Sequence, residues 1–191
     1  MTQADPHADP RWQRTHQDLL AAFLSLVIGR RYHDIRIADV LARSGVSRST
    51  FYEHFRNKDE LLSASLEEPF RILAGLITDD TDAARVRMML DHFWTNRALA
   101  PSLFQGPALR VVRGALITQV EAALDRGEFR LRIPARLAAH SLADGMFSPI
   151  TAWLLGESTC GSQDLAIALQ RTTAAAVRAL QTDSLPSGDT E

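Results

Sequence analysis

The segment from Ile37 to Phe55 constrains the fold of this chain more than any other part of its sequence. Two groups of apolar residues recur there with helical spacing, and Gly45 separates them. Ser47 is a favourable cap for the second group, and a glycine permits the sharp backbone turn between two short helices. The pattern predicts a helix-turn-helix. The residues expected to face its core are Ile37, Val40 and Leu41 in the first helix and Val46, Phe51 and Phe55 in the second.

This packing directs a set of polar side chains outward from the second helix, namely Arg48, Ser49, Tyr52 and Glu53. An arginine at the start of such a helix can donate two hydrogen bonds to the edge of a guanine in the major groove. Glu53 has two interpretations, because it can accept a hydrogen bond from cytosine or pair with Arg48 or Arg56. The alternative for the whole segment is a helical hairpin without a role in DNA binding.

Phosphate contacts are expected from hydroxyl groups and from the next helix. Ser49, Thr50 and Tyr52 carry hydroxyls that suit phosphate oxygens. Asn57 is a candidate cap for a helix that begins at Lys58, so both the lysine and the free N–H groups of that helix can hold a phosphate.

The distribution of charge agrees with a nucleic-acid contact in the N-terminal third. From Arg11 to Lys58 there are nine Arg or Lys residues against four acids, a net charge of +5, although the whole chain of 191 residues has a formal charge of only -2. From Asp59 onward there are twelve basic and seventeen acidic residues, a net of -5. A basic segment on an acidic body is expected where only that segment touches phosphate.

The rest of the pattern is helical, so the predicted fold class is all-α. Breaks at glycine, proline and short polar loops delimit the further helices, and residues 129–133 are too short and charged to predict a strand. The expected helices span residues 11–29, 37–44, 47–55, 58–76, 82–100, 107–127, 134–156 and 163–181.

Four parts of the chain follow from this pattern: a disordered segment over 1–10, a helix-turn-helix domain over 11–57, a larger helical domain over 58–182 and a disordered tail over 183–191. Cys160 is the single cysteine, which predicts neither a disulfide nor a zinc site; it is interpreted as a plain thiol, with a redox sensor as the alternative. Without a signal peptide pattern or an apolar run of membrane-spanning length, a cytoplasmic protein without membrane contact is expected.

The stretch IADVLARSGVSRSTFYEHF over residues 37–55, followed by NKDELL over 57–62, closely resembles the N-terminal signature of TetR-family repressors. The resemblance covers about fifty residues, and the remainder of the chain agrees only in being helical and of suitable length. It implies a helix-turn-helix DNA-binding domain followed by a helical domain that binds an effector and forms the dimer. It also implies that the third helix enters the major groove.

The resemblance assigns roles to single positions. Arg48, Ser49 and Glu53 match positions that face bases, whereas positions matching Thr50, Tyr52 and Lys58 contact the backbone. His54 matches a position that is near phosphate in some members and structural in others. Arg36 stands where many members carry Thr or Ser; it adds a possible phosphate contact but removes a cap, for which Asp34 is the alternative. The predicted DNA-binding set is Arg36, Ser47, Arg48, Ser49, Thr50, Tyr52, Glu53, His54 and Lys58.

The resemblance further implies a homodimer built by the last two helices. The apolar residues available for it are Leu137, Phe147, Ile150, Trp153 and Leu154 on one helix, and Leu165, Leu169, Thr172, Ala176 and Leu180 on the other. The alternative is that these side chains form the core of the single subunit.

An unknown small-molecule effector is expected among the middle helices, with no cofactor and no metal. The candidate pocket residues are Phe70, Leu73, Met88, Met89, His92, Phe93, Trp94, Phe104, His140, Asp144 and Phe147. Clusters of this kind are more often core than pocket. His140 and Asp144, four residues apart on one helix, are a possible polar handle for a ligand.

The sequence disfavours two other function classes. An enzyme is disfavoured because the sequence has no Gly-rich phosphate loop, no Gly-x-Ser-x-Gly and no His-Glu-x-x-His motif. An architectural DNA-binding protein would have a small, basic C-terminal part, whereas this one is large and acidic. The prediction is therefore a dimeric transcriptional regulator, a repressor by resemblance, that binds a palindromic operator and is released by its effector.

Overall fold

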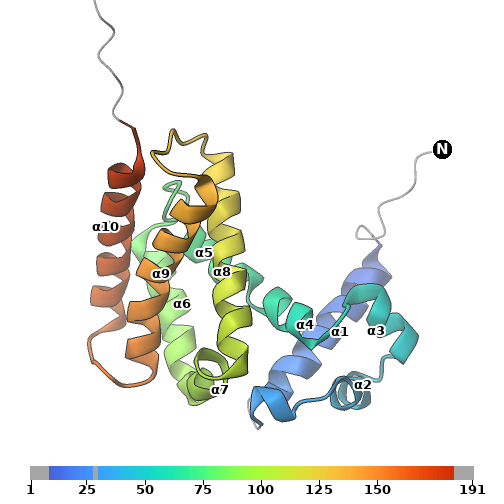
Figure 1. The fold of residues 1–191 in the computed structure, drawn as a ribbon. Helices are drawn as coiled ribbons and strands as arrows, with labels where there is room; N and C mark the ends of the chain where they lie inside the picture. Colours follow the sequence, from blue (N-terminus) through green and yellow to red (C-terminus); the bar gives the residue numbers. More distant parts are fainter. Residues whose placement is uncertain (1–8, 28–29, 183–191) are drawn as a thin grey trace, which may run out of the picture. The chain divides into compact units, whose positions relative to one another are not determined.

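The computed structural model describes residues 9–27 and 30–182 of the chain, and those residues form helices and connecting loops (Figure 1). The chain packs as two units. The first unit comprises residues 1–68 and 95–115, and the second comprises residues 69–94 and 116–191. No described helix is long and apolar enough to cross a membrane.

The first unit contains the predicted helix-turn-helix. Its elements are α1 (Pro10–Val27), the 3₁₀ turn η2 (Tyr32–Asp34), α2 (Ile37–Ser44), α3 (Arg48–His54), α4 (Lys58–Ser65), η3 (Arg97–Leu99), α7 (Ala100–Phe104) and the first part of α8 (Pro107–Arg126). Helix α1 packs against α2 and α4 (Figure 1). The unit thus includes α4 and residues 95–115, which the sequence analysis assigned to the C-terminal domain.

The second unit is a helical bundle. It holds most of α5 (Glu67–Ala74), α6 (Ala83–Thr95), the rest of α8, α9 (Ala135–Leu154) and α10 (Ser162–Leu180). Helices α9 and α10 lie side by side (Figure 1). Apolar side chains from several helices fill its centre, among them Leu73, Leu90, Leu116, Met146 and Leu169, each at most 1% exposed.

The predicted helix over 58–76 was wrong, because the structure divides it into α4 and α5 at Leu66. Pro69 explains the division. A proline has no N–H to donate to the carbonyl four residues earlier, and its ring clashes with that carbonyl, which here belongs to Ser65, the last residue of α4. In the first turn of α5 the same proline is tolerated.

The predicted helix over 82–100 was also wrong at its C-terminal end. Helix α6 ends at Thr95, the turn η3 follows, and Pro101 lies in the first turn of α7 instead of terminating a helix. The fixed φ angle of proline suits the start of a helix as well as the position after one, so Pro101 alone did not distinguish the two.

Some of the predictions concern residues that the structure does not describe. Residues 1–8, 28–29 and 183–191 lie outside the described residues, and with them most of the predicted N-terminal segment, Gly29 and the tail. Pro10, expected to precede the first helix, is its first residue. Residues 129–133 form no strand, although Leu131 makes an isolated antiparallel bridge with Gln181.

Candidate nucleic-acid interface

The turn between α2 and α3 has the geometry that the sequence predicts. Gly45 closes α2 with a φ of 71°, a left-handed conformation that favours glycine, and its N–H donates to the carbonyl of Leu41. Ser47 caps α3, because its hydroxyl oxygen accepts from the N–H of Thr50 at 3.2 Å. The backbone therefore leaves α2 and enters α3 within three residues.

The apolar side of the pair is anchored by Val40, Phe51 and Phe55, which are 1%, 0% and 3% exposed. The other residues predicted to face the core, Ile37, Leu41 and Val46, are only half-buried. The register of α3 is consequently determined by its two phenylalanines, and the opposite side of the helix faces outward.

The outward side of α3 carries the four residues that the sequence singled out, since Arg48, Ser49, Tyr52 and Glu53 are all exposed. The guanidinium carbon of Arg48 lies 5.6 Å from the centroid of the Tyr52 ring, and one guanidinium nitrogen is 3.4 Å from the tyrosine hydroxyl. That separation is long for a hydrogen bond, so the guanidinium remains available to another acceptor. Within the described residues, Glu53 forms no ion pair with Arg48 or Arg56.

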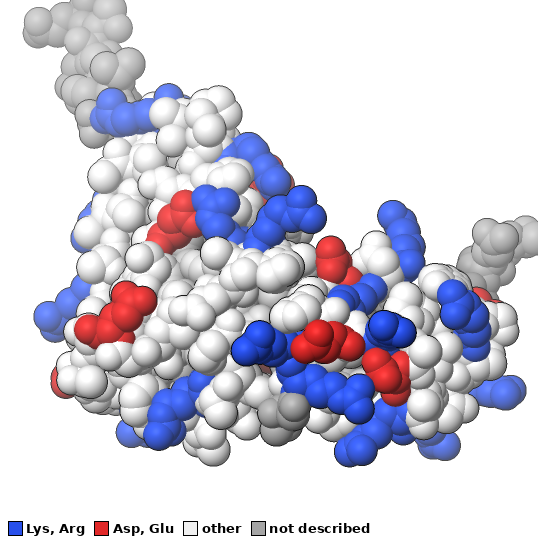
Figure 2. Space-filling model, turned by 60° about the horizontal axis from the view of Figure 1, so that its bottom comes forward, with Lys and Arg blue, Asp and Glu red and all other residues white. Residues whose placement is uncertain are grey.

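A cluster of hydroxyls lies at the start of α3. The Ser47 hydroxyl oxygen is 3.0 Å from that of Ser49 and 2.9 Å from that of Thr50. Ser47 and Ser49 are exposed, whereas Thr50 is half-buried. Hydroxyls of this kind can donate to phosphate oxygens, so the group is compatible with the predicted backbone contacts. Figure 2 shows Lys and Arg side chains protruding over the first unit, with some acidic side chains among them.

Arg36 is the residue before α2, and the cap of that helix comes from Asp39. The Asp39 carboxylate accepts from the N–H of Arg36 at 2.8 Å and also pairs with Arg30 at 3.3 Å. The hydrogen bond from the Arg36 backbone and the nearby arginines lower the pKa of Asp39. The alternative cap proposed from the sequence, Asp34, instead lies 3.3 Å from the His33 ring nitrogen. The exposed side chain of Arg36 is therefore not needed as a cap.

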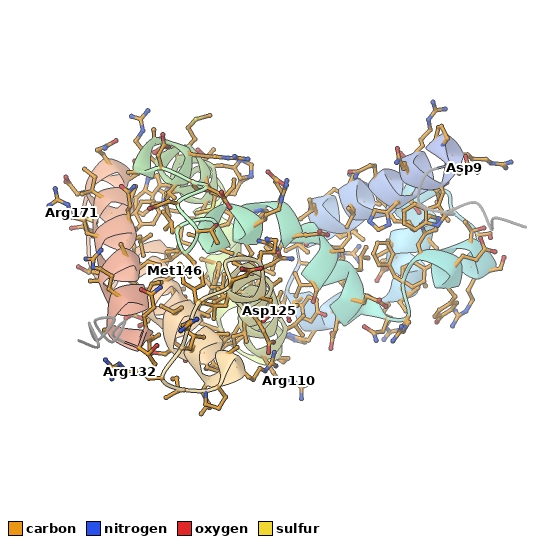
Figure 3. The ribbon with its side chains drawn as sticks, turned by 90° about the horizontal axis from the view of Figure 1, so that it is seen from above. Asp9, Arg110, Asp125, Arg132, Met146 and Arg171 are labelled. Carbon is orange, nitrogen blue, oxygen red and sulfur yellow. The ribbon has the colours of Figure 1, made fainter. Side chains whose placement is uncertain are left out.

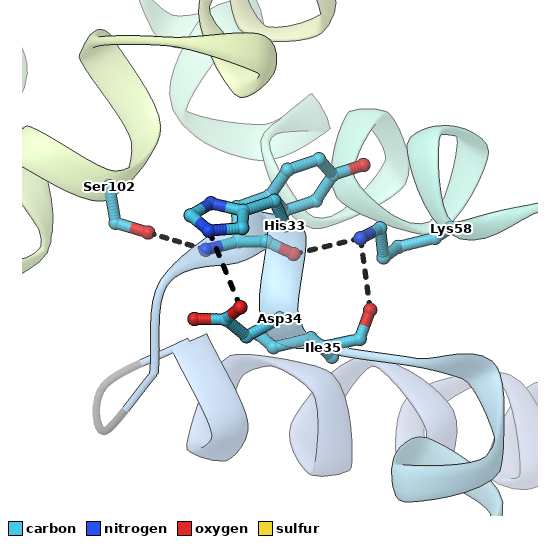
Figure 4. A network of polar contacts seen from close by, with 6 residues as sticks. His33, Asp34, Ile35, Lys58 and Ser102 are labelled. Atoms are coloured by element: carbon cyan, nitrogen blue, oxygen red, sulfur yellow. Dashed lines mark hydrogen bonds and ion pairs between the residues drawn. The ribbon is translucent and has the colours of Figure 1, made fainter.

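Lys58 is the only lysine in the sequence, and the structure gives it a role inside the protein (Figure 4). Its ammonium group donates to the carbonyl of Tyr32 at 2.8 Å and to that of Ile35 at 2.9 Å, and it lies 4.3 Å from the centroid of the Tyr32 ring. Burial lowers the pKa of Lys58, with Asp59 and Asp34 opposing that shift. Two of its three N–H groups are thus engaged, which the sequence analysis did not foresee.

Tyr32 is the centre of this network. Its hydroxyl donates to the carboxylate of Asp59, and its backbone N–H donates to the hydroxyl oxygen of Ser102 on α7 at 2.8 Å. Burial and the contact with Asp59 raise the pKa of Tyr32 well above its usual value. The turn η2, helix α4 and helix α7 are held together through one residue (Figure 4).

Replacing Lys58 with methionine is expected to lower the free energy of unfolding by about 2–3 kcal/mol. Methionine keeps the length and apolar stem of the side chain but leaves two backbone carbonyls without a charged donor, and such hydrogen bonds contribute roughly 1.5–3 kcal/mol each before relaxation. Urea unfolding followed by circular dichroism measures the change. Arg43→Met, which removes a charge from an exposed position, is the control; equal losses in the two variants would contradict the structural role of Lys58.

His54 lies in an aromatic cluster between α1 and α3. Its ring centroid is 4.4 Å from that of Trp12 and 5.7 Å from that of His16, and the His16 ring lies 4.7 Å from that of Phe55. Of the two interpretations left open by the sequence, the structure favours the structural one. The position of α3 against α1 depends on this cluster. In the sequence, the aromatic cluster could have been predicted from Trp12 and His16, which lie four residues apart and therefore on one side of a helix.

The predicted effector residues do not share one environment. Phe70, Leu73, Met89 and Phe147 are buried in the second unit, and Trp94 stacks on Trp153 with centroids 4.6 Å apart. Met88 is 66% exposed, so its placement in an interior pocket was wrong: it lies on the outer side of α6. Phe104 belongs to the first unit. His92 is exposed, and Phe93, His140 and Asp144 are half-buried.

A group of three or more His, Cys, Asp or Glu side chains able to hold a metal does not occur in residues 9–27 and 30–182. Cys160 is exposed and unbonded to another cysteine. Its backbone carbonyl accepts from the indole N–H of Trp153 at 3.1 Å.

The fold and the exposed face of α3 define a helix-turn-helix protein with a helical second unit. Residues 19–65 match the family model described as bacterial regulatory proteins, tetR family. The N-terminal part of the chain therefore carries the helix-turn-helix domain of the TetR family of transcriptional regulators.

Two curated relatives match part of the chain. The dhaKLM operon transcriptional activator DhaS of Lactococcus lactis is 37% identical over 68 residues, which are 36% of this chain and 35% of the activator. The Transposon Tn10 TetC protein of Escherichia coli is 29% identical over 76 residues, which are 40% of this chain and 39% of that protein. The matched segment therefore spans little more than a third of either relative.

Solved structures match over most of the chain. A TetR transcriptional regulator from Streptococcus agalactiae has 27% sequence identity and a TM-score of 0.53, with 85% of this chain and 95% of that one covered. The TetR family repressor AlkX from a Dietzia strain has 24% identity and a TM-score of 0.52, covering 86% of this chain and 98% of AlkX. The latter similarity concerns the fold alone.

Proposed function

We propose that this protein is a transcriptional regulator that binds a duplex DNA operator through α3. The observation that carries the proposal is the outward face of that helix, where Arg48, Ser49, Tyr52 and Glu53 are exposed while Phe51 and Phe55 hold the opposite side in the core. A helix of this kind fits the major groove, where arginine reads guanine and hydroxyl groups meet phosphates. The protein is proposed to act without catalysing a reaction.

The contacts divide into two kinds. Arg48, Ser49 and Glu53 are proposed to read bases, whereas Thr50, Tyr52 and Arg36 are proposed to contact phosphates. Lys58 is proposed to act in two ways, since its third N–H can reach a phosphate while the other two hold the backbone before α2. His54 is proposed to support α3 through the aromatic cluster rather than to touch DNA.

A homodimer through α9 and α10 is proposed to present two copies of α3 to a palindromic operator, with half-sites about one helical turn, ~10 bp, or a near multiple apart. The exposed side of α10 supports it. Ala168, Ala175 and Ala179 are exposed at spacings of seven and four residues and would permit close approach of a second helix. On α9, Leu137 is 58% exposed, and a side chain added at Gly145 would meet open space.

Six of the residues predicted for the dimer contact do not belong to this surface, because they are at most 7% exposed and fill the core of the subunit. They are Phe147, Ile150, Trp153 and Leu154 on α9, and Leu165 and Leu169 on α10. Arg171 projects outward from α10, whereas Met146 on α9 lies inside the bundle (Figure 3). The proposed contact is therefore made by the exposed alanines and by Leu137.

Repression is proposed, with release by a mainly apolar small molecule that binds in the second unit. The similar proteins include regulators of both kinds, since AlkX is named a repressor and DhaS an activator. Transcription in vitro from a promoter that carries the operator distinguishes them. A fall in transcript on addition of the protein supports repression, and a rise contradicts it.

The experiment that tests the core of the proposal is selection of bound fragments from a random duplex library. We expect a two-fold symmetric sequence to emerge, since two related recognition helices impose symmetry on their site. Recovery of fragments without a common sequence would contradict site-specific binding.

Replacing Met89 with tryptophan is expected to blunt the response to an effector while changing operator affinity less than about threefold. Met89 is 6% exposed in the second unit, so a larger side chain there fills space near the proposed ligand site. Apolar and cationic ligands are titrated against a preformed operator complex to measure the response. By linkage, operator DNA must weaken ligand binding by the same factor by which the ligand weakens DNA binding. A ligand that binds tightly without changing operator affinity would contradict the coupling. Met88→Trp, at the exposed position beside it, is the control.

A further inference from the structure

A hollow of about 510 Å³ lies in the first unit, apart from the outward face of α3. Segments that are distant in the sequence form it: the end of α1, the turn η2, and residues 98–107 from η3 through α7 to the start of α8. Its size is within the range of small-molecule sites. The proposed function makes no use of it.

The titratable groups that line the hollow are the phenol of Tyr32 and three basic side chains, those of Arg30, Arg31 and His33. Neither Asp nor Glu occurs among its described lining residues. Arg30 is paired with Asp39 and His33 with Asp34, each at 3.3 Å, but Arg31 forms no ion pair within the described part of the chain. One guanidinium is therefore available, whereas Arg30 and His33 already contact carboxylates that lie outside the lining.

The remaining lining combines hydrogen-bonding and apolar groups. Ser102 and Gln105 contribute a hydroxyl and an amide, whereas Val27, Pro101 and Pro107 contribute apolar surface. The Ser102 oxygen accepts from the Tyr32 N–H, so its own O–H proton can be donated to a ligand. An arginine fork, a hydroxyl and apolar walls are complementary to a ligand with an anionic end and a small apolar body.

We propose that this hollow is a binding site for an organic oxyanion, a carboxylate or a phosphate ester, held by Arg31 and the hydroxyl of Ser102. The site differs from the proposed effector site in the second unit and takes a ligand of opposite character. A hydroxyl that donates to an anion becomes a stronger acceptor, because neighbouring hydrogen bonds polarise one another. Binding therefore strengthens the contact between Ser102 and the Tyr32 N–H, through which α7 is joined to the network of Lys58 and Asp59.

The test uses the full chain and three small probes: benzoate, phenyl phosphate and the neutral benzamide. Each is titrated at constant ionic strength while the amide resonances are followed by NMR. Benzoate and phenyl phosphate are expected to bind at least about tenfold more tightly than benzamide, because a charge-assisted hydrogen bond is worth more than a neutral one. The two anions also tell a carboxylate ligand from a phosphate ester. No DNA is present, so the result is independent of the proposed function.

Two variants distinguish a built site from general attraction to a basic protein. Arg31→Gln is expected to weaken binding of the preferred anion about tenfold or more. Arg14→Gln removes the same charge from an exposed position thirteen residues before Val27 on α1, roughly 20 Å along the helix, and is expected to leave binding unchanged. Equal losses in both variants, or anions that bind no better than benzamide, would overturn the proposal.

The contribution of Ser102 has its own measurement. In the wild-type protein the preferred anion is expected to slow hydrogen exchange of the Tyr32 amide, because that N–H donates to the hydroxyl that the ligand contacts. In Ser102→Ala the anion should bind more weakly and leave this exchange unaffected. An exchange rate that does not respond in the wild-type protein would overturn the assignment of Ser102 to the site.

Discussion

Replacing Arg48 with alanine is expected to abolish base preference at one position in each half-site of the operator. A bidentate contact between arginine and guanine discriminates against other bases by roughly 1–3 kcal/mol, and a symmetric site contains two such contacts. Affinity for the selected operator should therefore fall by about 2–6 kcal/mol in total, while affinity for unrelated DNA changes much less. The side chain is exposed and its contact with the Tyr52 hydroxyl is long, so its removal should not disturb the helix.

Repeating the library selection with the variant identifies the affected position, and binding titrations on single-base variants of the operator give the magnitude. Tyr52→Phe is the matched comparison, because it keeps the ring beneath the guanidinium and removes only the hydroxyl. It should weaken all sequences alike, by about 1 kcal/mol per contact. If Arg48→Ala also weakens every sequence equally and keeps all base preferences, Arg48 contacts phosphate and another residue reads the base.

Replacing Ala175 with arginine is expected to convert the protein to a monomer and to reduce operator affinity by about a hundredfold or more. The alanine is exposed on α10, so the new side chain does not enter the core of the subunit. In the proposed dimer it would be buried opposite its symmetry copy, and burying like charges without partners is costly. Loss of the second half-site then removes the gain of bivalent binding, which is typically 10²–10⁴-fold.

Sedimentation velocity measures the oligomeric state, and binding to one and to two half-sites measures the consequence for DNA. Ala84→Arg is the control, since Ala84 is an exposed alanine on α6 of the same unit. Leu169→Arg is unsuitable, because it would place a charge in the interior of the subunit, where Leu169 is 1% exposed. A dimer of Ala175→Arg with unchanged operator binding would show that the dimer contact lies elsewhere.

The helix-turn-helix was determined by the sequence because local chemistry decides each of its parts. The capping hydroxyl of Ser47 and the left-handed conformation of Gly45 are properties of single residues and their neighbours in the chain. Phe51 and Phe55 lie four residues apart, so one helical turn brings them to the same side. The bounds of α2 and the exposure of Arg48 followed from this spacing. The break at Leu66 also has a local cause, which is Pro69. The sequence did not predict this break, because the helical spacing of apolar residues continues beyond the proline.

Only the tertiary structure decided which side chains are available for contacts. Lys58 looks like a free cation in the sequence, yet the fold brings its ammonium group to two carbonyls that lie 26 and 23 residues earlier. The ring of His54 on α3 contacts that of Trp12 on α1. Leu169 is buried in the subunit, although the sequence pattern placed it among the residues available for a dimer contact. The hollow beside Arg31 needs Ser102, seventy residues beyond Tyr32 in the chain. Helical periodicity fixes which residues share a face, but whether that face meets solvent, core or a partner depends on contacts between segments distant in sequence, which no local pattern records.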